Sequence, residues 1–327
     1  MKLLRRQFLQ LAAGAAALPL GSGAASADAY PSRFVHFIVP FPPGGASDPV
    51  ARVLGARLAE MWGQQVLVEN KGGAGGNIGA LAAAQSPPDG YTIFIATNFL
   101  ATNPYIYPTL GYDPLKDLAP ITRLTVFTNV LLVPVSSRVR SVKEFIDYAK
   151  ANPGKVSYAS PGIGTIQHLC GELFKRKAGI ELTHVAYRGG GPALTDLMAG
   201  RVEIMVATLP SVMSQIKAGT VRALAVTSAT RIPFAADIPT VSESALAGFD
   251  VSDGQSLYMP AKTPANYIAK VHDDVLAALS YPPVKRKFVD INVLIVTSAP
   301  EEVTTYLKGQ MAQWSAIIKD ANIKATN

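Results

Sequence analysis

The sequence is poor in cysteine. Cys170 is the only one among 327 residues, so an intrachain disulfide is excluded. It stands far from the N-terminal region, which also excludes a lipid-bearing cysteine at a processed N-terminus. It falls in a helix-like run, and His168, two positions earlier, would lie on a different helix face and could not activate it. We interpret Cys170 as a buried structural thiol.

Motifs that carry chemistry are also scarce. No G-x-S-x-G elbow occurs, and no Ser/His/acid set can be assigned from spacing, so a hydrolase is not favoured. Metal and flavin motifs are missing, and the histidines lack metal-ligand spacing. These are His36, His168, His184 and His272. We therefore expect no catalytic residues, no metal and no cofactor.

Charge is low and mildly positive. Charged residues make up 16% of the chain and hydrophobic residues 49%, a composition far from that of disordered proteins. The net charge is +7. No Lys/Arg block is interleaved with aromatic residues, so nucleic acid is not an expected partner. The balance suits a small anionic ligand instead.

The N-terminus has the form of an export signal. Basic residues, including the pair Arg5-Arg6, precede an apolar stretch at 8–20, and Ala-Ser-Ala at 25–27 offers a cleavage site. The run RRQFL resembles a twin-arginine signal, which favours that route over general secretion. The apolar stretch is shorter than the ~20 residues that span a bilayer, which disfavours a membrane anchor. We expect residues 1–27 to be removed during export to the periplasm.

The rest of the chain shows two sets of alternating strands and helices. A chain of 327 residues exceeds the usual size of one core, so two lobes are expected. Such alternation indicates a parallel sheet wrapped by right-handed crossovers. The predicted strands are 34–39, 65–69, 91–96, 130–133, 156–159, 184–187, 204–207 and 223–227. The predicted helices are 49–61, 78–84, 142–151, 166–178, 192–198, 264–279 and 300–323.

Each set contains one strand-to-helix turn rich in glycine. The first turn is PFPPGGASD at 40–48, and the second turn is SPGIGT at 160–165. Ligands of open α/β sheets bind at the carboxyl ends of the strands, where such turns lie. Glycine lets a ligand approach the backbone, and a helix N-terminus offers free N–H groups and partial positive charge. We expect the two turns to clamp a carboxylate through backbone donors, without a buried arginine.

Several runs also resemble one known family in sequence and order. They are VPFPPGGASDPVAR, VENKGGAGGNIGA, PPDGYT, YASPGIGT and YRGGGPALTDLMAGRVE, and the likeness extends from about residue 31 to the C-terminal IIKDANIK. The family is that of the substrate-binding receptors of tripartite tricarboxylate transporters, or Bug receptors. The resemblance implies an α/β, two-lobed periplasmic binding protein fold, type II-like, with a carboxylate-bearing ligand in the cleft between the lobes. It also implies delivery of that ligand to the permease subunits of a membrane transporter.

The pattern and the resemblance together predict how the chain divides. Lobe 1 would contain residues 28–126 and 228–327, and lobe 2 would contain residues 127–227. Crossover segments near 123–129 and 227–233 would allow the lobes to close. We expect a monomer that performs no chemistry on its ligand. A sensor that presents the ligand to a membrane signalling protein stays open as an alternative, because the sequence does not distinguish transport from signalling.

Carried over residue by residue, the resemblance implies a set of ligand-binding positions. They are Phe41, Gly44, Gly45, Ala46, Asp48, Thr97, Asn98, Ser160, Gly162, Gly164, Thr165, His168 and Ala207. Two departures from the family pattern affect the identity of the ligand. Ala207-Thr208 stands where relatives commonly have Asp-Asn, and residues 252–255 lack a Trp often found there.

Some of these residues also have structural interpretations. Asp48 precedes Pro49 as an N-cap precedes an N1 proline, so capping is slightly favoured over ligand contact. Thr165 is suited to cap the second helix. His168 lies one turn into that helix, where packing is commoner than ligand binding. Arg188, beside three glycines, could meet an anion but is interpreted as a surface residue.

The run GAGGNIG at 73–79 suggests a rival function, an exported enzyme with a dinucleotide cofactor. It follows a predicted strand and opens a helix, as a Rossmann fingerprint does. However, Ile78 occupies the third glycine position, and the next strand ends without the expected ribose-binding acid. We interpret these glycines as a tight turn.

Overall fold

A computed structural model describes residues 30–44 and 46–325 of the chain. The predicted signal, its cleavage site at Ala27, and Gly45 of the first turn lie outside the described residues. The described helices and strands all belong to one compact unit, Arg33–Asn327. None of these helices is both long enough and apolar enough to cross a membrane.

Three parallel strands form one end of the sheet. β1 (Val35–Val39) lies between β2 (Val66–Asn70) and β3 (Thr92–Ala96) and pairs with both in parallel. β3 is buried along its whole length, as expected for a strand covered on both faces. Helices α2 (Ser47–Trp62) and α3 (Asn77–Ala84) connect the three strands.

A second parallel group forms the other end. β5 (Ser157–Ser160) lies between β6 (Thr183–Ala186) and β7 (Ile204–Thr208) and pairs with both in parallel. Helix α6 (Ile166–Ala178) joins β5 to β6, and α7 (Gly190–Met198) joins β6 to β7. The structure thus contains the two predicted sets of alternating strands and helices.

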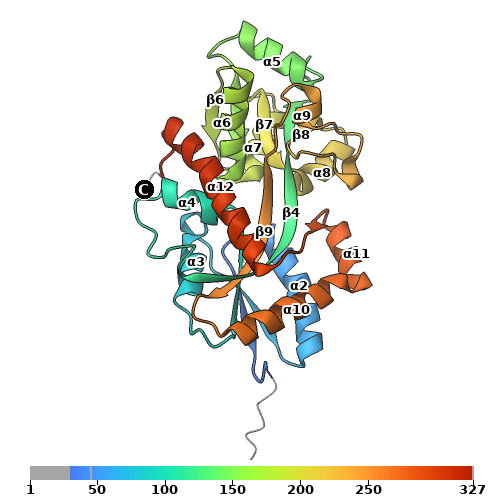
Figure 1. Ribbon diagram of the computed structural model, residues 1–327. Helices are drawn as coiled ribbons and strands as arrows, with labels where there is room; N and C mark the ends of the chain where they lie inside the picture. Colours follow the sequence, from blue (N-terminus) through green and yellow to red (C-terminus); the bar gives the residue numbers. More distant parts are fainter. Residues whose placement is uncertain (1–29, 45, 326–327) are drawn as a thin grey trace, which may run out of the picture. The chain divides into compact units, whose positions relative to one another are not determined.

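Two long strands, absent or incomplete in the prediction, join these groups. β9 (Ser252–Pro260) pairs antiparallel with β3 and with residues 118–128 of β4 (Leu118–Pro134). Residues 130–134 of β4 pair with β8 (Val221–Val226), and residues 129–132 pair with β7. The main strand order is β2-β1-β3-β9-β4-β7-β5-β6, and Figure 1 shows β4 and β9 side by side. The sheet is therefore mixed: the expected parallel pairing is present within the two groups, whereas β4, β8 and β9 pair antiparallel, which was not expected.

The remaining described elements cover the sheet or connect its strands. They are α4 (Phe99–Ile106), α5 (Val142–Ala151), α8 (Leu209–Lys217), α9 (Val241–Ser244), α10 (Ala265–Ser280), α11 (Pro282–Asp290), α12 (Pro300–Asp320), β10 (Leu294–Ile295) and the 3-10 helices η1 (Ala74–Gly76) and η2 (Pro233–Ala235). Helices α10 and α11 pack on α2, at the end of the unit opposite to α5 (Figure 1).

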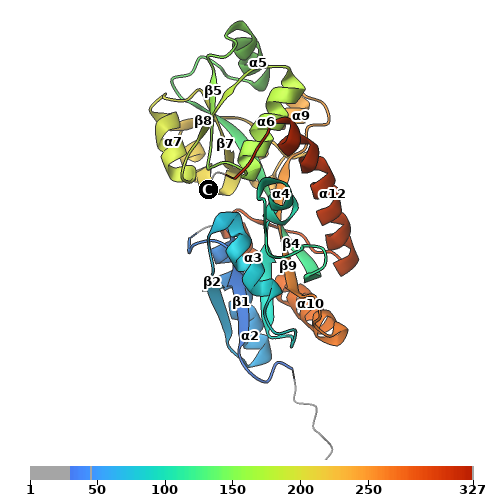
Figure 2. The ribbon, with the colours of Figure 1, turned by 90° about the vertical axis from the view of Figure 1, so that its left-hand side faces the viewer.

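Helix α12 takes part in both halves of the hydrophobic core. Val303 and Leu307 pack with side chains of β3 and α4. Trp314 and Ile317 pack instead with side chains of β5 and α6. The helix also lies against α4 (Figure 2). Cys170 is fully buried in this second half, as predicted, and burial raises the pKa of its thiol.

The fold is that of a two-lobed binding protein, in which β4 and α12 run from one lobe to the other. β4 changes partners between Thr128 and Asn129, where pairing with β9 ends and pairing with β7 begins. This change lies near the predicted boundary at residue 127. The boundaries and the crossover segments of the two lobes themselves stay predictions.

Candidate functional site

The first turn joins β1 to α2 and is closed by a carboxylate. Asp48 accepts hydrogen bonds from the backbone N–H of Gly44 (3.1 Å) and from Nδ2 of Asn70 (3.0 Å), and it pairs with Arg52 (2.9 Å). The N-cap of α2 is Ala46, without a side-chain cap, so the interpretation of Asp48 as N-cap was wrong. Burial alone would raise the pKa of Asp48, but these hydrogen bonds hold it below its usual value. The carboxylate therefore fixes the turn and neutralises Arg52.

This turn leaves open space at one glycine. Gly44 has a left-handed φ of +82°, and a Cβ built on it would meet no atom within 4 Å among the described residues beyond its chain neighbours. Ala46 is exposed at the start of α2. Phe41 is half-buried and packs edge-on against Phe99, the first residue of α4, with ring centroids 5.8 Å apart. The first turn is thus attached to α4.

Thr97 and Asn98 follow β3 and connect it to β9. The N–H of Asn98 donates to Oδ1 of Asp253 (3.3 Å), and its Nδ2 donates to the carbonyl of Ser252 (3.2 Å). Burial raises the pKa of Asp253 to about 6. Asn98 itself is buried, whereas Thr97 is half-buried.

The side chain of Asn98 also connects β3 to α12. Its Nδ2 donates to Oε1 of Gln310 (3.2 Å), and its Oδ1 accepts from the hydroxyl of Tyr306 (3.1 Å). The same Oε1 of Gln310 accepts from Nε1 of Trp314 (2.9 Å). The polar atoms of Asn98 therefore hold together β3, β9 and α12.

The second turn satisfies its own glycine N–H groups. Thr165 caps α6, as predicted, because its hydroxyl accepts from the N–H of His168 and donates to the carbonyl of Gly162 (2.8 Å). The N–H of Gly164 donates to Nδ1 of His168 (3.0 Å), and that of Gly162 donates to Oγ of Ser160 (3.2 Å). The N–H groups of these two glycines are therefore already bonded within the turn.

A stack of aromatic rings lies against the second turn. The rings of His168 and His184 are nearly parallel with centroids 3.9 Å apart, and Tyr158 stacks on His184 at 4.7 Å. Nε2 of His184 lies 2.7 Å from Oγ of Ser160, and the hydroxyl of Tyr158 donates to Glu172 (2.5 Å). Burial lowers the pKa of both histidines to about 4, so both rings are neutral at neutral pH. Because Nδ1 of His168 accepts from the N–H of Gly164, Nδ1 is the unprotonated nitrogen of that ring.

We expect the free energy of unfolding to fall as the pH is lowered from about 6.5 to about 4. The two histidines have native pKa values of about 4, against about 6.5 in an unfolded chain. Between these values the unfolded chain binds more protons, so each histidine costs up to about 1.4 kcal/mol per pH unit. The raised pKa of Asp253 acts in the opposite direction and offsets part of the loss. Denaturant titrations across this pH range measure the slope.

The matched variant for this measurement is His168→Asn. Its Oδ1 can still accept from the N–H of Gly164, but the side chain does not titrate. The number of protons taken up on unfolding sets the slope of unfolding free energy against pH, and this number should then decrease by up to one. Equal slopes in the variant and the wild type would show that His168 has the same pKa in both states.

Two backbone donors beside the second turn remain free. The N–H groups of Ile166 and Gln167, the first two residues of α6, have no hydrogen-bond partner among residues 30–44 and 46–325. They point along the axis of a 13-residue helix, whose N-terminus carries partial positive charge. A carboxylate would satisfy both, so the anchor offered by this turn is the start of α6 rather than its glycines.

Helix α4 contacts both turns. Its first residue, Phe99, contacts Phe41 of the first turn. Its last residue, Ile106, touches the second turn, since a Cβ on Gly164 would lie 3.0 Å from Cδ1 of Ile106. These two residues are separated by seven helical rises, about 10 Å. Both turns therefore pack against the same short helix.

The structure does not bring Ala207 to this site. Ala207 lies within β7 and is buried in the core, and the next residue of the strand, Thr208, is half-buried and faces the opposite side of the sheet. Arg188 is exposed, as predicted, in a segment whose Gly189 N–H donates to the carbonyl of Pro161 (2.9 Å). The sequence predicted residue 207 as a ligand-binding position, whereas residue 208 is the more accessible of the two.

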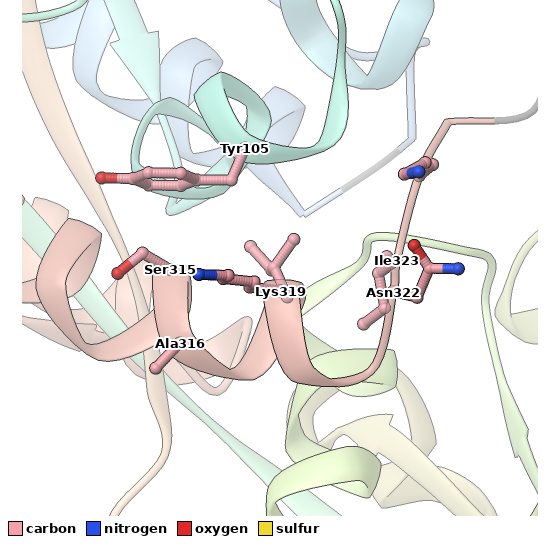
Figure 3. A pocket seen from close by; sticks show the side chains of 8 residues that line it. Tyr105, Ser315, Ala316, Lys319, Asn322 and Ile323 are labelled. Atoms are coloured by element: carbon pink, nitrogen blue, oxygen red, sulfur yellow. The ribbon is translucent and has the colours of Figure 1, made fainter.

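Three cavities lie apart from the two turns. One of about 580 Å³ lies between Tyr105 of α4 and the C-terminal part of α12, where Tyr105 faces Ser315 and Lys319 (Figure 3). The others, of about 460 and 550 Å³, lie beside the contact of α6 with α12. None of the three is lined by a predicted ligand-binding residue.

Comparison with known proteins identifies the family. Residues 50–323 match the model of the tripartite tricarboxylate transporter family receptor, TctC. The chain belongs to this family. A protein encoded in the tcbD–tcbE intergenic region of a Pseudomonas strain, P51, is 38% identical over 299 residues, which cover 91% of this chain and 89% of that one.

Solved structures agree with the sequence match. R. palustris Rpa4515, determined with adipate, is 34% identical, with a TM-score of 0.82 and coverage of 90% of this chain and 100% of that one. The periplasmic binding protein BugD is also 34% identical, with a TM-score of 0.78 and the same coverage. The predicted resemblance to Bug receptors and the predicted two-lobed fold are confirmed. TctC proteins are receptors, not enzymes, which removes the dinucleotide-dependent enzyme as an alternative.

Proposed function

We propose that this protein is a periplasmic receptor that captures a small carboxylate between its two lobes and delivers it to a tripartite tricarboxylate-type permease. The family membership supports a solute receptor, and the adipate in Rpa4515 supports a carboxylate ligand. Export would remove residues 1–27, and the mature protein would act as a monomer.

The observation that carries the proposal is the pair of free N–H groups at the start of α6. They belong to Ile166 and Gln167, and the neutral ring of His168 holds the preceding loop in place. Arg52, near the first turn, is already paired with Asp48. The anion would therefore be held by oriented backbone dipoles and not by a cationic side chain.

The first turn would close over the bound carboxylate. Gly44 leaves open space there among the described residues, and α4 contacts the first turn through Phe99 and the second turn through Ile106. Closure would bend the strands that run between the lobes, near the change of partners in β4. The closed receptor would then present a continuous surface to the permease.

The proposal is tested by calorimetric titration of residues 28–327 with mono-, di- and tricarboxylates, adipate among them. We expect saturable binding of at least one carboxylate with one site per chain. Deletion of the gene should then abolish uptake of that carboxylate by the parent cell. Failure of every carboxylate to bind would refute the receptor proposal, whereas binding without any effect on uptake would refute delivery to a permease.

A further inference from the structure

The tripeptide Lys-Arg-Lys occurs twice in the chain, at residues 175–177 of α6 and at residues 285–287 of α11. In α6 each cation has a partner. The first two pair with Glu172 (2.9 Å) and Asp320 (2.6 Å), and the third donates to the carbonyl of Gly248 (3.4 Å). In α11 all three side chains are exposed, and none has a hydrogen-bond or ion-pair partner among residues 30–44 and 46–325. The same tripeptide is thus paired in one helix and unpaired in the other.

An exposed valine lies beside these cations on the outer face of α11. Val284 and Phe288 are buried and form the inner face of the helix. Val289 is 64% exposed. It follows Lys285 by four positions and Arg286 by three, so these three side chains are neighbours on the outer face. The outer face of α11 therefore combines positive charge with an apolar side chain.

The acids around α11 do not balance these cations. α11 packs on α2, on α10 and on the apolar strand β10. Asp48 and Glu60 of α2 and Asp274 of α10 each pair with a basic residue of their own helix. Two further acids, Asp273 of α10 and Asp290 of α11, pair with no lysine or arginine in the part of the chain that the structure describes. Because they are fewer than the three cations, positive charge remains in excess on α11.

We propose that the outer face of α11 docks the protein on the anionic phospholipid surface of a membrane. Lys285 and Arg286, with Lys287 at the border of the face, lie at the level of the lipid phosphates, and Val289 enters the boundary with the acyl chains. Each lysine or arginine near such a surface adds to the affinity. Figure 1 shows α11 on the side of the unit away from α4, so docking leaves the two glycine-rich turns clear of the lipid.

The test measures sedimentation of residues 28–327 with vesicles of phosphatidylcholine, alone or mixed with an equal amount of phosphatidylglycerol. Charge reversal on α11 is compared with the same charge change at three exposed lysines near α5, at the opposite end of the unit (Figure 1). The two variants are K285E/R286E/K287E and K143E/K150E/K155E.

We expect wild type to bind the mixed vesicles and not the neutral ones. The α11 variant should lose at least about tenfold in partition coefficient, whereas the α5 variant should bind like wild type. Salt at about 0.15 M screens charges far from the lipid, so only those near the contact act. Val289→Ser should weaken binding severalfold, because it removes the apolar side chain and keeps the cations.

Each other outcome decides against the proposal. Equal binding of wild type to both kinds of vesicle, or binding to neither, refutes docking on anionic lipid. Equal loss in the two triple variants would show that the overall charge acts and not α11. If Val289→Ser binds like wild type, the valine does not enter the lipid. If vesicles bind none of the proteins but carboxylate uptake falls in the α11 variant alone, α11 contacts an acidic protein surface instead. Circular dichroism confirms that the variants are folded, and carboxylate titrations test the receptor function separately.

Discussion

Ile166→Pro is expected to weaken carboxylate binding about 10- to 100-fold, because it deletes one of the two free N–H groups at the start of α6. A hydrogen bond from a backbone donor to a charged group contributes about 1.5–3 kcal/mol. Proline is well tolerated at the first position of a helix. The preceding Thr165 already has the extended conformation that proline requires, with φ −67° and ψ 155°.

The matched control is Ile166→Ala, since Ile166 is also buried in the core. Both variants lose the packing of isoleucine, but only alanine keeps the N–H. Calorimetry at one fixed ionic strength separates the two effects, because salt screens the charge at the helix end. If Ile166→Pro binds as tightly as Ile166→Ala, the anchor does not lie at the start of α6.

Gly171→Ala is expected to lower the free energy of unfolding by about 3 kcal/mol or more. Gly171 lies within α6, and a Cβ there would come within 2.2 Å of Cε2 of Tyr158. Tyr158 is fully buried and its hydroxyl is bonded to Glu172, so the ring has no room to move away. Helix α6 can therefore approach the ring of Tyr158 this closely only because Gly171 has no side chain.

Gly309→Ala provides the opposite case with the same chemical change. Gly309 lies within α12, is exposed, and would place its Cβ in open space. Alanine there should stabilise the protein by about 0.5–1 kcal/mol through helix propensity. Urea titrations followed by circular dichroism compare the two variants. Similar unfolding free energies for both would show that the ring of Tyr158 yields to the new methyl group.

The sequence predicted elements well where local signals and burial agree. The helix predicted at 166–178 matches α6, which begins at a threonine cap and ends before Gly179 in the left-handed conformation. β9 was missed because SDGQSLYMP contains residues typical of loops. In the fold, Gln255 is fully buried. Its Nε2 donates to Oγ of Ser47 (2.8 Å), and its Oε1 accepts from the hydroxyl of Thr125 (3.1 Å). Partners so distant in sequence leave no local pattern.

The candidate site was predicted only in outline for the same reason. The two turns were located from their glycines, and Thr165 was recognised as a possible cap. The stack beneath the second turn could not be foreseen, because Tyr158 and His184 meet only through the register of β5 with β6.

The contact of Trp314 with Gln310 gives the protein an internal fluorescent probe. The chain has two tryptophans, and Trp314 shares the carbonyl oxygen of Gln310 with Asn98 at the end of β3. Trp62 instead donates to Asp274 on the far helix α10 (2.6 Å). A shift of Asn98 would change the polarity around one indole and leave the other unaffected. Emission from Trp314 can therefore report on the site in solution without any attached dye.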